Sequence, residues 1–336
     1  MEKLKFLVIR FSSIGDIVLT TPVMRLIKAK YPDSELHYVT KEKFKSVVEH
    51  NPNIDVLHLL GDSLSDCIDE LKNTEYDYVV DLHNNFRSKR VRRRVKAKHV
   101  SWLNKLDIRK FIYTTFKINR MPDVHITDRE VDTLKMLDIQ NDNLGLEYYI
   151  SEEDNKKALE LTSTLNDDYV AFVIGATYYT KRMPAELIAK IADKLCKPVV
   201  LVGGPDDFDA AQLIENQCKN NKILNLCSKL PLNVSAGIVK NASLVIAHDT
   251  GLMHIAAAFK KNIITIWGNT VPDFGMYACE PGKLSADFEV KNLKCRPCSK
   301  LGYHKCPKKH FNCMNQQPLD AIVDKANEIL QTSTSK

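Results

Sequence analysis

The sequence alternates short apolar segments with amphipathic segments along most of its length, in two successive series. Short apolar runs between turn residues are typical of buried strands, and longer amphipathic stretches are typical of helices. Strands that alternate with helices form parallel sheets, because a crossover must carry the chain back to the starting edge. The alternation therefore predicts an α/β protein.

The first series begins with a strand at 4–11 and a helix at 17–30, which Tyr31 and Pro32 end. Residues 102–113 mix polar and aromatic side chains, and we predict an irregular region there. The remaining strands are predicted at 35–40, 56–60 and 76–82, and the remaining helices at 42–49, 64–73, 85–95 and 125–137.

The second series starts at Ser151, which provides an N-cap ahead of early carboxylates for a helix that runs to about residue 165. Strands are predicted at 169–174, 198–202, 222–226, 244–247 and 263–267, and helices at 185–195, 208–219, 233–240 and 252–258. The two series predict two doubly wound, Rossmann-like domains, residues 1–150 and 151–336, that face each other across a cleft.

The composition fits this architecture, since 336 residues with 44% hydrophobic and 27% charged side chains suffice for two globular domains. The longest apolar runs, such as 199–202 and 263–267, are far shorter than the roughly 20 residues that span a bilayer. The apolar run at 6–9 is also too short for the core of a signal peptide. We therefore expect a cytoplasmic protein.

Residues 87–98, which we call the basic segment, hold eight basic residues and no acidic one. Removing these eight cations would change the net charge from +6 to −2. Such a segment indicates a surface that meets phosphate, on nucleic acid, a lipid head group or a sugar phosphate. The alternative is a solvated helix face.

Ligands of open α/β sheets bind beyond the carboxyl ends of the strands, so the loops at those ends are the candidate sites. The loop after the first strand, residues 10–16, is neither a dinucleotide-binding nor an NTP-binding glycine motif. Its Asp16 could accept a proton from a substrate hydroxyl, and the alternative is that Asp16 only caps the following helix.

Two loops of the second series combine charge with a helix start. In the loop 175–184, Lys181 or Arg182 would neutralise a diphosphate unless the loop only faces solvent, and Pro184 is placed to open a helix. In the turn 203–207, two glycines allow close backbone approach, and either Asp206 or Asp207 could bind a sugar hydroxyl. Capping alone would also explain both aspartates.

The loop 248–254 reads His-Asp-Thr-Gly-Leu-Met-His and follows an apolar strand. Backbone N–H groups near Thr250 and Gly251 would point at a phosphate, with the dipole of the following helix in support. The alternatives are that Asp249 is only a cap and that His254 is a hydrogen-bonded core residue.

These segments together resemble glycosyltransferase family 9, the heptosyltransferase family, over nearly the whole chain. The matching segments are RFSSIGDIVLTTP, TKRMP, GGPDD, HDTGLMH and a tail with CRPC and two later cysteines. The resemblance implies a GT-B fold, with an N-terminal acceptor domain and a C-terminal nucleotide-sugar domain. It implies a donor that is typically ADP-L-glycero-D-manno-heptose and an anionic, lipid-linked acceptor of the lipopolysaccharide core at the inner leaflet.

The resemblance also assigns roles to residues. It places the general base on Asp16, a phosphate-binding lysine on Lys181 and other donor contacts on Thr177, Asp207, Asp249, Thr250, Gly251 and His254. Acceptor contacts fall on Ser12, Ser13 and Gly15 of the first loop and on Arg87, Arg90 and Arg93 of the basic segment, which would meet acceptor or membrane phosphate. Because cations and a helix end replace a metal at the leaving group, no cofactor is required for catalysis.

The chain departs from the family pattern at two positions. Met183 stands where relatives commonly carry tryptophan, and Asp207 stands where a glutamate often holds the donor ribose. Both departures bear on the donor pocket.

Four of the nine cysteines, Cys295, Cys298, Cys306 and Cys313, cluster near the C-terminus. The first pair has good spacing for a structural zinc ion, whereas the later intervals are irregular for a standard finger. The alternative is a loop packed by reduced thiols. The other five cysteines are expected to be buried small side chains or surface thiols.

Two rival functions remain open. A nucleic-acid-binding protein with a structural zinc would use the basic segment on the phosphate backbone. We do not expect nucleic acid as a partner, because that segment lacks interleaved aromatic residues and the cysteines lie in the other half of the chain. A non-catalytic relative would bind the sugar nucleotide without transfer, although Asp16 and Lys181 are both retained.

Overall fold

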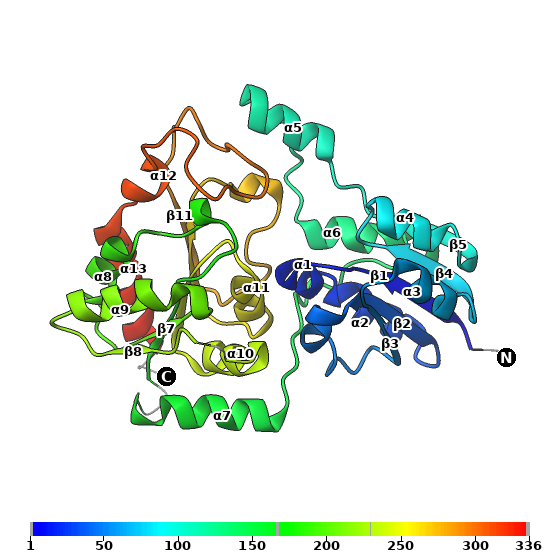
Figure 1. The fold of residues 1–336 in the computed structure, drawn as a ribbon, viewed down its shortest axis with the longest axis horizontal. Coiled ribbons are helices and arrows are strands. Elements are labelled where there is room, and N and C mark those ends of the chain that lie inside the picture. The colour runs from blue at the N-terminus through cyan, green and yellow to red at the C-terminus, as the bar shows by residue number, and fades with distance from the viewer. Residues whose placement is uncertain (1–2, 166–167, 229, 334–336) are drawn as a thin grey trace. The chain divides into compact units, whose positions relative to one another are not determined.

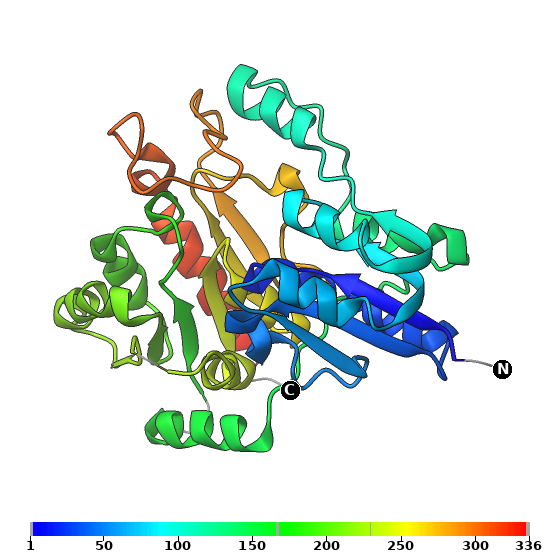
Figure 2. The ribbon, with the colours of Figure 1, turned by 45° about the vertical axis from the view of Figure 1, so that its right-hand side comes forward.

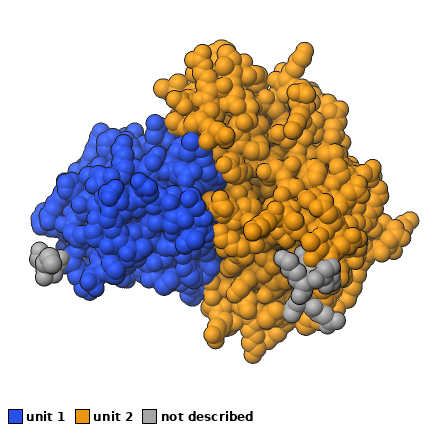
Figure 3. Space-filling model, turned by 180° about the vertical axis from the view of Figure 1, so that it is seen from behind, with its two compact units in different colours: residues 1–105, 124–149 blue, residues 106–123, 150–336 orange. Residues whose placement is uncertain are grey.

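The computed structural model describes residues 3–165, 168–228 and 230–333. Its secondary structure forms two parallel sheets, of five and six strands, with helices on both faces of each (Figure 1). The internal contacts divide the chain into unit 1, Met1–Lys105 with Val124–Tyr149, and unit 2, Leu106–Asp123 with Ile150–Lys336 (Figure 3). The predicted α/β class with two doubly wound parallel sheets is confirmed.

The sheet of unit 1 has the strand order β3-β2-β1-β4-β5. Its strands are β1 Lys5–Ile9, β2 Glu35–Lys41, β3 Val56–Leu60, β4 Glu75–Asp81 and β5 Lys96–Trp102. Its helices are α1 Ile14–Leu19, α2 Thr21–Lys30, α3 Leu64–Leu71, α4 Phe86–Arg92 and α6 Ile126–Val131, with 3₁₀ helices η1 Glu42–Val47 and η2 Asp132–Leu137.

Successive side chains of β1 point to opposite faces of this sheet. Leu7 and Ile9 belong to one apolar cluster with α3 and α4 residues, among them Ile68 and Val91. On the other face, Phe6 lies with its ring centroid 5.8 Å from that of Tyr31, which caps α2. Burial on both faces is what a central parallel strand requires, and it explains the continuous apolar run.

The sheet of unit 2 has the strand order β11-β10-β9-β6-β7-β8. Its strands are β6 Val170–Val173, β7 Val199–Val202, β8 Ile223–Asn225, β9 Leu244–His248, β10 Ile263–Trp267 and β11 Ala286–Glu289. Its helices are α5 Asp107–Phe116, α7 Glu152–Thr162, α8 Ala185–Ala192, α9 Phe208–Gln217, α10 Leu232–Asn241, α11 Gly251–Ala258, α12 Asn312–Asn315 and α13 Leu319–Ser333, with 3₁₀ helices η3 Ser163–Leu165, η4 Tyr179–Lys181, η5 Pro205–Asp207 and η6 Pro272–Phe274.

One apolar cluster of unit 2 lies between its sheet and three helices. Phe172, Leu201 and Ile246 of the sheet form this cluster with buried residues of α8, α9 and α13.

The N-cap predicted for α7 is confirmed: the Ser151 side chain accepts the N–H of Asp154 at 3.0 Å. All strands of each sheet run parallel, so their carboxyl ends, with the loops that follow, gather along one edge.

Several predicted elements differ from the structure. The helix predicted at 17–30 is two helices, α1 and α2, with Thr20 between them, and the helices predicted at 42–49 and 125–137 are wholly or partly 3₁₀. The prediction of an irregular region at 102–113 was wrong, because α5 covers most of it. The sequence reading also missed the edge strands β5 and β11.

The missed strand β5 shows why polar edge strands escape such a reading. Lys96 pairs with Glu75 and Lys98 pairs with Asp77, each at 2.8 Å across the ladder with β4. Charged residues are common on edge strands, and no residue of β5 is buried, so the strand has no apolar alternation that a sequence reading could detect.

Within the described residues, we find no helix with the length and apolar character that would let it cross a membrane.

Candidate active site

The loop after β1 brings Asp16 to the carboxyl edge of the unit 1 sheet. Ser13 is the N-cap of α1, and Asp16 is the N3 residue of its capping box, so Asp16 does help to cap the helix, although not as the N-cap residue itself. Asp16 lies one turn later, and its Oδ2 accepts the Ser13 hydroxyl at 2.6 Å and the Ser13 N–H at 3.1 Å. Its side chain is 29% exposed, so a substrate hydroxyl can reach it. Ser12 and Gly15 lie in the same loop, and Gly15 is buried in the first turn of α1.

Arg10 holds the other carboxylate oxygen of Asp16. Its Nη2 lies 2.5 Å from Asp16 Oδ1, and its Nε donates to the carbonyl of Ser12 at 3.0 Å. Arg10 is itself buried, and its Nη1 donates to the carbonyl of Leu82 and lies 3.9 Å from Glu130 Oε1. Asp16 is thus fixed by partners on both oxygens.

Glu130, on α6, is a second acid in this cluster that the sequence reading missed. It is fully buried, and burial raises the pKa of Glu130 to about 8, although the positive charge of Arg10 acts in the opposite direction. Burial and the nearby charge of Arg10 also lower the pKa of His83, directly after β4, to about 3. At neutral pH the cluster therefore combines a protonated Glu130 with a neutral His83, and Arg10 has its short ion pair with Asp16.

The structure divides the basic segment between α4 and β5. Arg92 lies 3.3 Å from Asp81 and stacks on the ring of Trp102, while Lys96 and Lys98 pair across the sheet. Five exposed cations have no ion pair among the described residues: Arg87, Lys89, Arg90, Arg93 and Arg94. The three predicted acceptor-binding arginines are all in this group, so an anion can reach each of them.

In unit 2, the ends of β9 and β10 and the loop after β6 meet at Asp249. The Lys181 Nζ donates to Asp249 Oδ2 at 2.6 Å and to the Asp249 carbonyl at 3.2 Å. Thr270 donates its hydroxyl to the same Oδ2 at 2.9 Å. The alternative of Asp249 as a helix cap was wrong, since Thr250 occupies the N-cap of α11. An ammonium group has three protons, so Lys181 retains one donor for a ligand.

A second ion pair lies beside the first. Arg182 Nη1 lies 3.0 Å from Asp207 Oδ1, and the N–H of Gly204 donates to Asp207 Oδ2 at 2.9 Å. A Cβ at Gly175 would overlap the Asp207 carboxylate, and one at Gly203 would lie 2.9 Å from it. The glycines of both loops therefore make room for Asp207, which is buried.

The N-terminus of α11 carries an unsatisfied hydroxyl. Thr250 Oγ1 is buried and has no hydrogen-bond partner among the described residues, and Gly251 is the first helical residue. Such a helix start offers free N–H groups to an anion. His254 is buried one turn further along.

His248, the last residue of β9, is uncharged at neutral pH. Burial lowers the pKa of His248 to about 4, and its Nε2 accepts the N–H of Met183 at 3.1 Å. Met183, where relatives commonly carry tryptophan, points its side chain into the apolar core of unit 2. Thr177 is exposed in the loop after β6.

Sequence reasoning missed the loop after β10. Asn269 is fully buried, and both polar atoms of its side chain lack a hydrogen-bond partner in the described part of the chain. Thr270, next to it, binds Asp249. The signal was present: Gly268, Asn269 and Thr270 directly follow an apolar strand, as the other site loops do.

The four clustered cysteines do not form a ligand set in this arrangement. Across the described ranges, no three or more His, Cys, Asp or Glu side chains are placed to hold a metal ion. Cys313 packs in the core, and burial raises the pKa of its thiol to about 12. The zinc site stays a prediction from spacing. Of the other five, Cys67, Cys227 and Cys279 are buried, Cys218 is half-buried and Cys196 is exposed, as expected.

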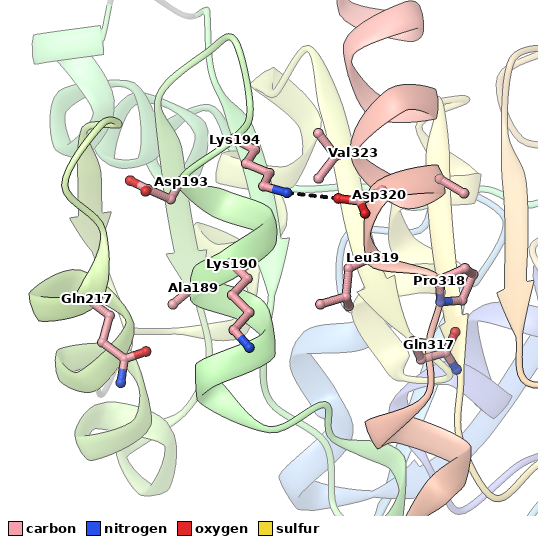
Figure 4. A pocket seen from close by; sticks show the side chains of 11 residues that line it. Ala189, Lys190, Asp193, Lys194, Gln217, Gln317, Pro318, Leu319, Asp320 and Val323 are labelled. Carbon is pink, nitrogen blue, oxygen red and sulfur yellow. Dashed lines mark hydrogen bonds and ion pairs between the residues drawn. The ribbon is translucent and has the colours of Figure 1, made fainter.

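A pocket of about 730 Å³ lies elsewhere in unit 2, between α8, the end of α9 and the start of α13 (Figure 4). The ion pair of Lys194 and Asp320, at 2.8 Å, crosses it. None of the predicted site residues lines this pocket, which belongs to the helical layer rather than to the carboxyl edge of the sheet.

Comparisons with known proteins give the fold and the family of the chain. Lipopolysaccharide heptosyltransferase 3 of Escherichia coli K12 is 26% identical over 277 residues, which are 76% of this chain and 80% of that protein. A family 9 glycosyltransferase of Veillonella parvula superposes with a TM-score of 0.78 at 24% identity, covering 99% of both chains. The E. coli ADP-heptose lps heptosyltransferase II superposes with a TM-score of 0.76 at 19% identity, covering 98% of this chain and 100% of that one. These two likenesses confirm the GT-B fold. Residues 66–304 match the profile of glycosyltransferase family 9 (heptosyltransferase), and the chain therefore belongs to this family.

Proposed function

We propose that this glycosyltransferase moves a heptose from ADP-heptose to an anionic, lipid-linked acceptor of the lipopolysaccharide core, with inversion at the anomeric carbon. The names of the relatives support the donor and the acceptor class. The observation that carries the proposal is the cluster of Lys181, Asp249 and the start of α11 at the carboxyl edge of the unit 2 sheet.

The donor half of the mechanism rests on this cluster. The free donor of Lys181, the Thr250 hydroxyl and the first N–H groups of α11 would bind the diphosphate of the donor. They would stabilise the negative charge that develops as the bond between the anomeric carbon and the phosphate oxygen breaks. Fixed donors of this kind supply the charge stabilisation without a metal ion at the leaving group.

The acceptor half rests on Asp16. Its carboxylate would take the proton of the acceptor hydroxyl while the hydroxyl oxygen forms the new bond to the anomeric carbon. The electron pair of the broken bond leaves with ADP, so charge and atoms balance. Arg10 and Ser13 hold the carboxylate in place for this transfer.

The exposed cations of the basic segment would bind phosphates of the acceptor or of the membrane surface in which it is anchored. Each basic side chain near an anionic membrane contributes about 1 kcal/mol, so the exposed ones would hold the protein there reversibly. We accordingly place the protein in the cytoplasm, peripheral to the inner leaflet of the cytoplasmic membrane.

The melting temperature with ADP, GDP or UDP at equal millimolar concentration tests the donor, since a ligand that binds the folded state stabilises it. We expect a selective rise with ADP, followed by heptose transfer from ADP-heptose to a core acceptor. A preference for GDP or UDP would replace the donor. Salt-dependent binding to DNA or RNA with no nucleotide shift would favour the rival function, and an ADP shift without transfer would indicate a non-catalytic relative.

A further inference from the structure

Helix α5 presents its apolar side away from the body of unit 2. None of its side chains is buried, and Figure 2 shows it as a separate helix apart from the sheet of unit 2. Ile108, Phe111 and Phe116 are 78%, 59% and 62% exposed. A surface helix of a globular protein normally turns this side toward the core.

The polar side of α5 makes its contacts with the rest of unit 2. The Tyr113 hydroxyl donates to Asp273 at 2.9 Å, and the ring of Tyr113 meets that of Phe274 edge-on at 5.9 Å between centroids. Lys117, one turn further, donates to the carbonyl of Pro297 at 2.7 Å. These contacts fix which side of the helix faces outward.

The outward side has the helical repeat. Ile108, Phe111, Ile112 and Phe116 follow the i, i+3, i+4, i+8 spacing that places side chains on one stripe. Ile118, just past the helix, is 50% exposed. Contiguous exposed apolar side chains of this size mark an interaction surface.

The charges around this stripe identify the partner. The exposed Arg109 and Arg120 accompany the stripe, while Lys110 and Lys117 lie on the side that contacts Phe274 and Pro297. The acids of residues 107–120 reduce to Asp107, which pairs with Lys300 at 2.9 Å. Large apolar side chains bordered by cations are the composition of helices that lie in the interface of an anionic bilayer. A second copy of the chain would bring the same cations face to face.

We infer that α5 is an interfacial helix, which inserts Ile108, Phe111 and Phe116 among the acyl chains of an anionic membrane. The inference deepens the proposed function, from which it takes the lipid-linked acceptor. Insertion would hold unit 2 at the membrane surface through an element distinct from the basic segment of unit 1.

The first test is co-sedimentation of the full chain with vesicles of phosphatidylcholine, with or without phosphatidylglycerol. We expect binding to the anionic vesicles alone. Phe111→Ser combined with Phe116→Ser should weaken it on the order of tenfold or more. Leu144→Ser, which removes an apolar side chain that is 63% exposed elsewhere, should leave binding unchanged. Equal binding by the double variant, or no binding by the wild type, would overturn the inference.

Two further measurements show whether the double variant is folded and whether a second copy of the chain covers the stripe. An unchanged urea midpoint would show that the double variant is folded. Sedimentation equilibrium without vesicles should give the same mass for wild type and variant. A wild-type dimer that becomes a monomer in the double variant would overturn the inference, because the stripe would then be covered by a second copy of the chain and not by a membrane.

Transfer assays separate this inference from the proposed function. The double variant should keep its rate on a deacylated, water-soluble acceptor and lose rate on the same acceptor carried in anionic vesicles. Equal losses on both would contradict a membrane role. No transfer by the wild type on either acceptor would end the proposed function, while the vesicle result would still decide the role of α5.

Discussion

The Lys181 ammonium group lies 2.6 Å from a carboxylate oxygen of Asp249. Because Thr270 binds the same oxygen, the pair is fixed before any ligand arrives. The carboxylate orients the lysine, but it would repel a diphosphate if the lysine were removed.

Removal of Lys181 is therefore expected to affect donor binding in two ways. Lys181→Ala should abolish most of the ADP-dependent rise in melting temperature, because it deletes a cation and leaves Asp249 uncompensated. Adding Asp249→Asn should restore part of the rise. Lys219→Ala, an exposed lysine on the same unit, is the matched control, and an undiminished ADP shift in Lys181→Ala would refute the assignment.

Replacement of the proposed base should affect turnover and spare donor binding. Asp16→Asn keeps the shape of the side chain but cannot accept the proton, so kcat should fall on the order of 10²-fold or more. The ADP-dependent melting shift should stay as in the wild type. Asp62→Asn, at an exposed aspartate of unit 1, should keep its rate, and near-normal kcat in Asp16→Asn would remove Asp16 from the mechanism.

Glu130 should make stability depend on pH. Its folded pKa of about 8 exceeds the ordinary value of 4.5, so the folded state binds the proton more tightly than the unfolded chain. This contribution is complete below the unfolded pKa and is lost as pH rises through about 8. The amide of Glu130→Gln resembles the protonated acid at every pH. As the pH rises from 5 to 8, the free energy of unfolding should therefore fall less in this variant than in the wild type.

Urea denaturation across this pH range measures the difference. Each pKa unit corresponds to about 1.4 kcal/mol, so the effect should be large enough to resolve. Glu160→Gln, at an exposed glutamate, should follow the wild type. Parallel curves for Glu130→Gln and wild type would show that Glu130 is ionised in the folded protein.

Gly175 should be intolerant of a side chain. In Gly175→Ala the new Cβ would displace the Asp207 carboxylate and break its contact with Arg182, at a cost of about 1–3 kcal/mol. Gly61→Ala is the control, because its Cβ would meet nothing closer than Glu42 Oε2 at 4.0 Å. Equal melting temperatures of the two variants would show that the loop adapts without cost.

Much of the architecture could be predicted, because buried parallel strands are apolar along their whole length. Val199–Val202 is a continuous apolar run for this reason, and Ile263–Trp267 is apolar except for Thr265; the structure has strands at both. Strand β5 could not be found in this way, since its lysines pair with acids of β4 instead of alternating with core residues. Helix α5 does have an apolar repeat at helical spacing, at Ile108, Phe111, Ile112 and Phe116, which the prediction of an irregular region overlooked.

For the site, the strand-end rule located Asp16, Lys181 and Asp249, but it could not supply their partners. Glu130 lies 120 positions after Arg10 in the sequence. The two side chains come within 3.9 Å of each other only because the fold places α6 next to the loop that follows β1. The buried state of Glu130, and hence its raised pKa, also depends on this packing.

The path of the chain through α5 decides how the protein can be dissected. Residues Leu106–Asp123 leave unit 1, join unit 2 and are followed by Val124–Tyr149, which belongs to unit 1 again. A fragment cut near residue 150 would carry α5 without Asp273 and Pro297, on which its polar side rests. To study unit 1 alone, 1–105 must be joined directly to 124–149, and α5 must stay with the other piece.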